Sequence, residues 1–463
     1  MTKEKRASWS GSLAFVLAAS ASAVGLGNLW RFPYLAAKYG GGVFIAVYLI
    51  LSLTLGFTLL VTEIALGRYS RQSQLTAFRQ LGHPRWNFLG VLSTVVPLFI
   101  LPYYNVIGGW VVKYFAAYAK MVSGGGGMGD PRAFYESFIS APWDPFVCMG
   151  LFTVATCAVI LVGVKNGIEK ANLVMMPVLL AMACGIAVYV AALPGSAAGI
   201  RFYLVPDFSS CDNIGKVVLG AMGQMFYSLS LAMGIMITYG SYMRRCDSVS
   251  KASVRIVAAD TFVAVLSGFM IIPVVVMFSG SEGTRAAIDV GPGLMFVTLP
   301  KVFASLGPAG LWIGFLFFVL VLFAALTSAI SMTEACVASV CDFFRARRSV
   351  SVAAVCVWSL ALGAVSAFGY GRWADFRPCG LPALEFFDTS MNVLTPVVAA
   401  LICVFVGWVL RPKRILAECR RDGGNVGFAL FYAVMVKFVA PVLVLAILAS
   451  EVCRIFGIGG WAI

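Results

Sequence analysis

Charged residues and histidine are scarce in this chain of 463 residues. Asp, Glu, Lys and Arg make up 12% of it, and histidine occurs once, as His83. A single histidine cannot by itself build a metal site or a catalytic triad. The twelve cysteines form no CxxC pair and lie mostly within apolar runs, as small buried hydrophobes do. We therefore expect neither an enzyme nor a cofactor.

Apolar residues are in excess: 60% of the chain is hydrophobic and the mean hydropathy is +0.92. Soluble cores could not bury so much apolar surface, and in lipid only helices or closed barrels satisfy every backbone amide and carbonyl. Apolar runs of about 17–25 residues favour membrane-spanning helices. Eleven such segments lie near residues 11–37, 41–67, 88–120, 145–164, 168–192, 217–242, 253–279, 308–340, 350–369, 384–410 and 427–454.

The net charge of +14 does not indicate nucleic-acid binding, because the basic residues form no continuous face. They gather in alternate hydrophilic stretches between the apolar segments. Of the 34 Lys and Arg, 21 fall on one side of the membrane if the N-terminus is inside. The positive-inside rule then predicts a multi-pass protein of the cell membrane with a cytoplasmic N-terminus and, after eleven spans, an extracytoplasmic C-terminus.

Two segments are interrupted by small and polar residues, the first at 20–28 and the sixth at 228–234. They are five segments apart, so segments one to five and six to ten have opposite orientations, as in inverted repeats with two broken helices. The alternative is that small residues only allow helices to pack closely. The expected organisation is a cytoplasmic segment 1–10, a core 11–410 with repeats at about 11–192 and 217–410, and a final part 411–463 with a loop, the eleventh helix and a short outer tail.

A break at membrane depth frees carbonyls that can replace the water of a sodium ion, and it leaves half-helix amides that favour a carboxylate. Neutral oxygen ligands are available at these breaks from Ser20, Ser22, Asn28, Ser228 and Ser230.

Ionisable residues within apolar runs usually mark function. For Glu63 we favour a structural role, capping amides freed in a neighbouring broken helix. For Asp260 we favour a functional role, because no base lies within four residues on its own helix.

The sequence Gly25-Leu-Gly-Asn-Leu-Trp-Arg-Phe-Pro33 resembles the first helix of the neurotransmitter:sodium symporters. Further matches follow in order along nearly the whole chain: EIALGR at 63–68, QMFYSLSL at 224–231, TYGSY at 238–242, GPGLMFVTLP at 291–300 and LTS at 326–328. The resemblance implies an all-α membrane protein of eleven transmembrane helices, with a 5+5 inverted repeat, broken helices one and six, and one extra helix.

The resemblance also implies two sodium sites. The first would use the Ala23 carbonyl, Asn28, Ser228 and Asp260, together with the substrate carboxylate. Asp260 stands where many relatives carry asparagine, so its charge could replace the chloride that several animal relatives need, and we expect no chloride requirement. The second site would use carbonyls of Ala21, Val24 and Ala324 with the hydroxyls of Thr327 and Ser328. Sodium is the only metal expected.

The substrate class follows from Gly25, because amine-transporting relatives carry an aspartate there. A substrate that brings its own carboxylate, an α-amino acid, is therefore expected. The implied substrate-binding residues are Ala23, Gly25, Gly27, Ile100, Tyr104, Tyr227, Ser228, Ser230, Met233, Ala329 and Met332. Small Ala329 and the adaptable methionines favour a large apolar or aromatic side chain, although Ala232 replaces a common glycine and trims this space.

The same resemblance implies an outer gate and an inner gate. Arg31 and Asp388 match the outer pair, with Glu385 as the alternative acid. Arg6, Trp9, Tyr242 and Asp342 match the inner closure. The implied function is sodium-coupled symport of a neutral L-amino acid by alternating access across the bilayer. The alternative is a membrane sensor that binds an amino acid without transporting it.

Overall fold

The computed structural model describes residues 7–208, 213–287, 292–422 and 427–456, and within these ranges the chain is helical without a β-strand. The first ten helices are α1 (Ser12–Ala23), α2 (Phe32–Lys38), α3 (Gly42–Leu51), α4 (Phe57–Ser70), α5 (Gln74–Gln80), α6 (Asn87–Val122), α7 (Pro131–Ile139), α8 (Asp144–Val162), α9 (Lys170–Ala192) and α10 (Ser196–Leu204).

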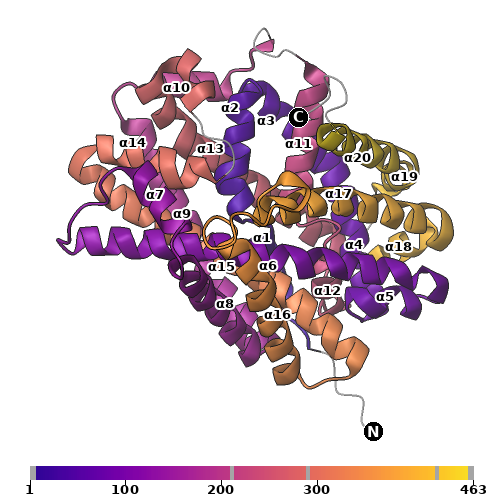
Figure 1. Cartoon of the computed structure of the whole chain (residues 1–463). Helices are drawn as coiled ribbons and strands as arrows, with labels where there is room; N and C mark the ends of the chain where they lie inside the picture. The colour runs from indigo at the N-terminus through magenta and orange to yellow at the C-terminus, as the bar shows by residue number, and fades with distance from the viewer. Residues whose placement is uncertain (1–6, 209–212, 288–291, 423–426, 457–463) are drawn as a thin grey trace.

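The remaining ten helices pack into the same bundle (Figure 1). They are α11 (Ile214–Ser228), α12 (Ile235–Ser241), α13 (Val249–Ala287), α14 (Leu299–Ser305), α15 (Gly307–Phe344), α16 (Arg348–Phe368), α17 (Ala383–Val404), α18 (Pro412–Cys419), α19 (Ala429–Val434) and α20 (Ala440–Phe456). Short π-helical segments continue or join several of them, at Gly27–Arg31, Ser52–Gly56, Val164–Glu169, Leu294–Thr298, Phe405–Leu410 and Met435–Val439, and 3-10 turns lie at Pro84–Trp86, Pro378–Gly380 and Arg420–Asp422.

The first predicted span is broken. α1 ends at Ala23, Val24 has an extended backbone (φ −73°, ψ 97°), and the chain resumes as a helix that is bent by 53°. The sixth predicted span is also interrupted, because α11 ends at Ser228 and α12 begins only at Ile235. Both breaks lie where small and polar residues interrupt the apolar pattern.

Nine helices in the described ranges are long and apolar enough to cross a membrane, and the bent pair that contains α1 and α2 makes ten. An eleventh span requires α11 and α12 to be counted as one, because neither half is long enough to cross alone. The predicted segments otherwise coincide with helices, so the multi-pass helical architecture holds.

The two long connections at 121–144 and 280–307 are less irregular than their glycines and prolines indicate. α7 lies in the first, with Pro131 in its first turn and the Asp130 carboxylate accepting a hydrogen bond from the Ala133 amide at 3.1 Å. α14 lies in the second, with Pro300 in its first turn. Proline is compatible with the first turn because those amides lack intrahelical partners anyway.

Glycine allows the central helices to approach closely. A Cβ atom on Gly240 of α12 would collide with the carbonyl oxygen of Ile64 on α4, and one on Gly67 would collide with the Ile237 carbonyl. α4 and α12 therefore pack backbone to backbone. This contact holds the second half of the interrupted α11–α12 segment against α4.

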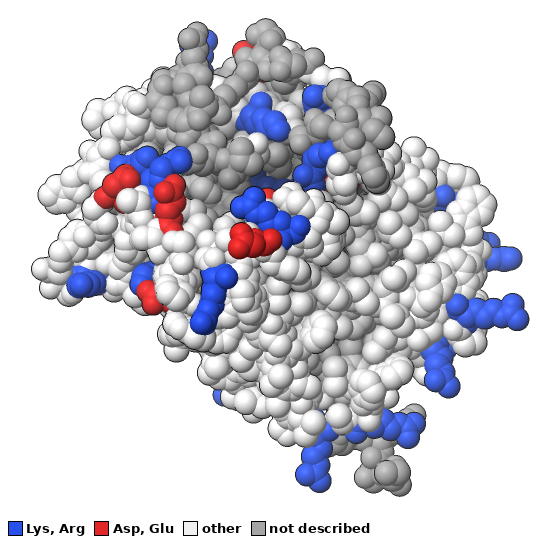
Figure 2. Space-filling view, viewed as in Figure 1, with Lys and Arg blue, Asp and Glu red and all other residues white. Residues whose placement is uncertain are grey.

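Charged side chains are distributed unevenly over the surface. Figure 2 shows a broad surface without charged side chains between groups of both signs at the left and centre of this face and the Lys and Arg at its right and lower edges. A surface of this kind is what a polytopic protein presents to the hydrocarbon of a bilayer.

Candidate functional site

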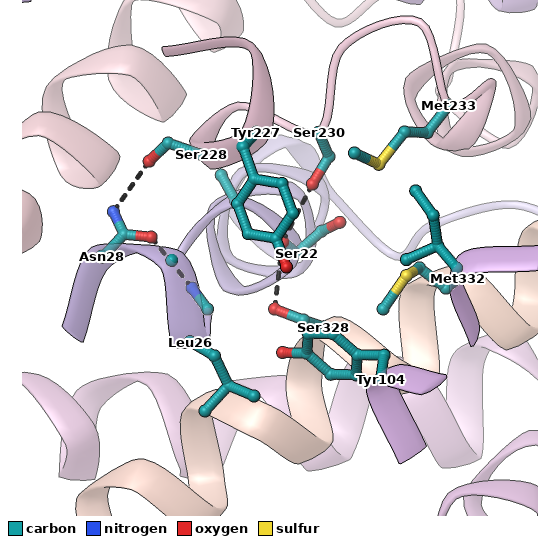
Figure 3. Close-up of a pocket in the computed structure, with 14 residues that line it drawn as sticks. Ser22, Leu26, Asn28, Tyr104, Tyr227, Ser228, Ser230, Met233, Ser328 and Met332 are labelled. Carbon is teal, nitrogen blue, oxygen red and sulfur yellow. Dashed lines mark hydrogen bonds between the residues drawn. The ribbon is translucent and has the colours of Figure 1, made fainter. Parts of the chain in front are cut away.

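A cavity lies between the two helix breaks. Its lining residues come from the α1–α2 and α11–α12 breaks and from α6 and α15: Ser22, Ala23, Gly25, Leu26, Gly27, Asn28, Ile100, Tyr104, Tyr227, Ser228, Ser230, Met233, Ser328 and Met332. In Figure 3 the polar groups lie at the left and centre, and Met233 and Met332 lie together at the right. The cavity therefore has a polar end and an apolar end.

Asn28 is the centre of a buried polar cluster. Its Nδ2 donates to Ser228 Oγ at 2.9 Å, and its Oδ1 accepts from the Gly25 amide at 3.1 Å (Figure 3). The same Nδ2 also donates to Asp260 Oδ1 at 2.8 Å. Ser228 Oγ donates to the same Asp260 oxygen at 2.8 Å, and Tyr48 donates to Asp260 Oδ2 at 3.1 Å. The carboxylate is fully buried, and the amide, hydroxyl and carboxylate together form a set of hard oxygen donors of the kind that a hard cation prefers.

A second group of oxygens lies where α15 passes the break in α1. Ser328 Oγ donates to the carbonyl oxygens of Ser22 at 3.2 Å and Val24 at 3.5 Å. Thr327 Oγ1 donates to the carbonyl of Ala324 at 3.0 Å. Of the predicted second sodium site, the structure thus brings Ser328 to the Val24 carbonyl and Thr327 to the Ala324 carbonyl on its own helix, and the site as a whole remains a prediction.

Two glycines keep the polar end of the cavity open. A Cβ atom on Gly25 would lie 2.5 Å from Ser328 Oγ, and one on Gly27 would lie 2.5 Å from the Tyr227 ring. Tyr104 faces this space beside Ser328 and the Leu26 amide, and its buried hydroxyl lacks a well-formed hydrogen bond within the described ranges. A buried hydroxyl of this kind beside the Leu26 amide suits an anionic oxygen of a ligand.

The α11–α12 break has a strained backbone. Ser230 and Ala232 adopt the left-handed conformation, with φ of 52° and 62°, and this costs a non-glycine residue roughly 1 kcal/mol or more. Ser230 Oγ donates to the Ser22 carbonyl at 3.2 Å, and the Ala232 amide donates to Glu63 Oε1 at 2.6 Å. The capping role predicted for Glu63 is confirmed by this contact.

Comparison with known proteins identifies the family in which this fold and site occur. The model of the sodium:neurotransmitter symporter family matches residues 6–122 and 140–458. The chain belongs to the sodium:neurotransmitter symporter family. It is 33% identical over 454 residues to the sodium-dependent transporter YhdH of Bacillus subtilis, covering 96% of this chain and 98% of that one.

More distant and structural relatives agree with this assignment. A sodium- and chloride-dependent GABA transporter 2 of Homo sapiens is 25% identical, and the match covers 89% of this chain and 74% of that protein. The crystal structure of MhsT in complex with L-phenylalanine superposes with a TM-score of 0.86 at 33% identity, covering 96% of this chain and 100% of that one. This symporter is thus a multi-pass membrane protein of a sodium-dependent transporter family, which is not an enzyme family.

Nearly all of the predicted substrate-binding residues of this symporter line the cavity. Ala329 does not: it is fully buried in α15 but lies outside the lining. Leu26 lines the cavity and was not predicted, because an apolar residue inside an apolar segment gives no sequence signal. Ser22 and Ser328 line it as well, so the polar residues of the breaks also face the substrate space.

Of the predicted outer-gate residues, Arg31 lines a second cavity, and Asp388 binds Tyr103 and Asn392, which line the same cavity. Arg31 lines it and lies over the Tyr227 ring, with 5.5 Å from Cζ to the ring centre. Asp388 accepts hydrogen bonds from Tyr103 at 3.1 Å and Asn392 at 3.0 Å. Arg31 forms no ion pair with any acid in the described ranges, so the charges that would close this gate are apart in this conformation. Glu385, the alternative acid, is exposed and faces Tyr370 at 3.5 Å.

At the opposite end of the protein, the described residues that are predicted to form the inner gate are held in close contacts. Trp9 is buried, its Nε1 donates to the Tyr239 carbonyl at 3.1 Å, and its ring lies edge-on to Tyr242. Asp342 accepts a hydrogen bond from the Ser73 amide at 2.7 Å. Arg6 lies outside the described residues, so its predicted contact is not tested.

Glu334 and Arg348 belong to this inner end and were not predicted. The Tyr242 hydroxyl donates to Glu334 Oε1 at 2.8 Å, and Arg348 Nη2 lies 2.5 Å from Glu334 Oε2. The Glu334 side chain is fully buried, and Glu334 follows Ser328 by six residues on α15. An acid near the polar end of a long apolar helix could have been recognised by the cost of burying it.

Proposed function

We propose that this protein is a sodium-coupled symporter of a neutral L-amino acid with a large apolar or aromatic side chain, working by alternating access. The observation that carries the proposal is the cavity between the two helix breaks, which combines hard oxygen donors at one end with Met233 and Met332 at the other. Its polar end suits a zwitterion with a sodium ion beside it, and its apolar end suits a hydrophobic side chain.

The substrate carboxylate would bind at the break in α1. The backbone at Leu26 and Gly27 and the Tyr104 hydroxyl would offer donors there, whereas the Gly25 amide already donates to Asn28. Because a Cβ atom on Gly25 would meet Ser328 at 2.5 Å, the site has no room for a protein carboxylate at that position. A substrate must therefore bring its own carboxylate, which favours amino acids over simple amines. Its ammonium group would meet carbonyls near Ala23 and the α11 end around Tyr227 and Ser228.

The side-chain preference rests on the apolar end of the cavity. Ile100, Met233 and Met332 line it, and methionine adapts to different ligand shapes. The structural relative MhsT was crystallised with L-phenylalanine, which agrees with a pocket for a large apolar side chain. We infer the same substrate class for this chain.

Two sodium ions would couple transport. The first would bind between Ala23, Asn28, Ser228, Asp260 and the substrate carboxylate, and the second between Ala21, Val24, Ala324, Thr327 and Ser328. Each sodium that moves inward gains about 2.3 kcal/mol per 100 mV of membrane potential. Two ions thus exceed the roughly 2.7 kcal/mol needed to concentrate a neutral solute a hundredfold.

In alternating access, the two helix breaks would act as hinges. Sodium would order the first break and favour the outward-open state, and the substrate would then complete the first site and allow Arg31 and Asp388 to close above it. Release inward would require Trp9 to leave its contacts with Tyr239 and Tyr242. Coupling arises because the ligands bind the two states with different affinities.

The proposed topology has eleven spans, with α11 and α12 counted as one, a 5+5 inverted repeat and a final extra span. The basic inner loops predict a cytoplasmic N-terminus and an extracytoplasmic C-terminus. Protease accessibility of epitope tags at the two termini in sealed membrane vesicles tests this orientation, because tags on opposite sides are expected.

Uptake into proteoliposomes tests the function. Purified protein is reconstituted, an inward sodium gradient is imposed, and radiolabelled phenylalanine, leucine, glycine and GABA are compared. We expect uptake of the large apolar amino acids that collapses when the gradient is removed. Sodium-dependent binding without accumulation would instead favour the alternative, an amino-acid sensor. Absence of sodium-dependent binding to any amino acid would refute both.

A further inference from the structure

One lysine interrupts the last apolar segment. Residues Ala429–Ile455 form a candidate membrane span, and Lys437 is the only charged residue between positions 429 and 450. The side chains around it are exposed and apolar: Phe438 is 53% and Val434 43% exposed. A cation on a lipid-facing surface is costly, so Lys437 requires an explanation beyond packing.

The ammonium group of Lys437 rests on aromatic rings. Its Nζ lies 4.6 Å from the centre of the Trp408 ring and 5.3 Å from that of Phe438. Trp408 is itself 54% exposed. No carboxylate in the described ranges forms an ion pair with Lys437. Cation–π contacts contribute only about 0.5–2 kcal/mol and do not neutralise the charge. An anion from outside the chain could therefore bind at this ammonium group.

The seam between Phe405–Leu410 and Met435–Val439 is closely packed beneath this lysine. A Cβ atom on Gly407 would lie 3.1 Å from the Lys437 Cα atom. The lysine side chain reaches Trp408, and the Phe405–Leu410 segment that contains Trp408 leads directly into α18. A lysine stem can lie along apolar surface while its ammonium group reaches toward a polar region.

α18 is a short amphipathic helix at the same end. It buries Ile415 and Leu416 and exposes Lys413 and Arg414, and Arg411 at its start is also exposed. In Figure 1 α18 lies at the right of the bundle, and Figure 2 shows Lys and Arg without acidic side chains along that edge. A basic amphipathic helix beside a span is typical of a surface that contacts anionic lipid head groups.

We propose that this seam binds an anionic phospholipid, with its phosphate at Lys437 and the α18 bases, and its acyl chains on Phe438 and Val434. We call the surface formed by Trp408, Arg411, Lys437 and Phe438 the Lys437 seam. A phospholipid matches both halves of the surface, because it brings a negative head group to the bases and hydrocarbon to the exposed apolar side chains. A protein partner would have to cover the same apolar face and supply a carboxylate within the hydrocarbon, which is costly.

Native mass spectrometry of the full-length protein tests the proposal. The protein is incubated with phosphatidylglycerol or phosphatidylcholine, and bound lipid is counted for the wild type, Lys437→Gln, Lys437→Arg and the matched control Lys301→Gln, at an exposed position of α14. We expect retained phosphatidylglycerol to fall about fivefold in Lys437→Gln, as for the loss of one basic group at an anionic surface. Lys437→Arg and Lys301→Gln should bind like the wild type.

Equal phosphatidylglycerol retention in Lys437→Gln and Lys301→Gln would overturn the proposal. So would a dimer that disappears only in Lys437→Gln, because the seam would then be occupied by a second copy of the chain. Thermal unfolding of each variant without added lipid reports whether it is folded. A variant that unfolds at a lower temperature than the wild type is replaced in the comparison by Trp408→Leu. The readout needs no transport, so its outcome is independent of the proposed symport.

Discussion

Replacing Asp260 with asparagine removes a charge while leaving its surroundings intact. Asp260 Oδ1 accepts hydrogen bonds from Asn28 and Ser228 at 2.8 Å each, and Oδ2 accepts from Tyr48 at 3.1 Å. In Asp260→Asn the side-chain oxygen can keep the first two contacts, and the new amide can donate to the Tyr48 hydroxyl, which also accepts. The variant is therefore expected to fold, so that a change in ion binding reports the charge itself.

The size of the effect follows from the burial of this carboxylate. A unit charge about 4 Å from an ion contributes about 4 kcal/mol at an effective dielectric constant of about 20. The cost of desolvating the carboxylate offsets part of this gain. We expect a net loss of about 1.4–2.8 kcal/mol, which corresponds to sodium affinity about 10- to 100-fold weaker.

The assay compares sodium dependence with and without chloride. Sodium-dependent amino-acid binding is measured by scintillation proximity in chloride and in gluconate. The wild type should be indifferent to chloride, and Asp260→Asn should bind sodium weakly in gluconate and more tightly in chloride. Asp144→Asn is the control, because this exposed carboxylate pairs with Lys113 far from the cluster. Unchanged sodium affinity in Asp260→Asn, or no response to chloride, would refute the reasoning.

Three further substitutions test the scaffold. Glu63→Ala leaves the Ala232 amide buried without its acceptor and should lower stability by about 1–3 kcal/mol, whereas Glu63→Gln retains an acceptor and should be milder; thermal unfolding measures both. Arg68→Ala removes the buried partner of Glu418 and leaves it only the half-exposed Arg421 at 3.0 Å, so the cost should lie below the about 3–5 kcal/mol of a fully unpaired buried charge, with the double variant less damaged than the sum of the single ones. Tyr242→Phe removes the 2.8 Å hydrogen bond to α15 and should favour the inward-open state, seen as faster labelling of a cysteine introduced below the cavity.

Controls separate these effects from general damage. Glu63→Gln and Glu63→Ala of equal stability would show that the contact with the Ala232 amide is unimportant. Additive losses for the two buried ion-pair variants would show that Arg68 and Glu418 do not interact energetically. For Tyr242→Phe, labelling equal to the wild type, with sodium and without it, would contradict a role in the inner closure.

Much of the local structure was predictable from the chain. The apolar runs locate the helices, and the small and polar residues at 20–28 and 228–234 locate both breaks. The resemblance at Gly25 implies a substrate that brings its own carboxylate, and the structure adds that Ser328 and Tyr227 occupy the space that side chains at positions 25 and 27 would need. The helices in the long connections were missed because proline at a first helical turn and proline in a loop look alike in sequence.

The sequence by itself determined which segments cross the membrane, where two of them break and which oxygen donors are near the breaks, because hydropathy and backbone propensity act between neighbours along the chain. Only the tertiary structure decided which groups meet. Asn28 reaches Asp260 across 232 residues of sequence, and Tyr242 meets Glu334, a contact that was not predicted. Such contacts depend on how helices cross and rotate, and close crossings such as that of Gly240 against Ile64 set those angles. The cluster around Asn28 is therefore a product of packing, built from residues that the sequence supplied separately.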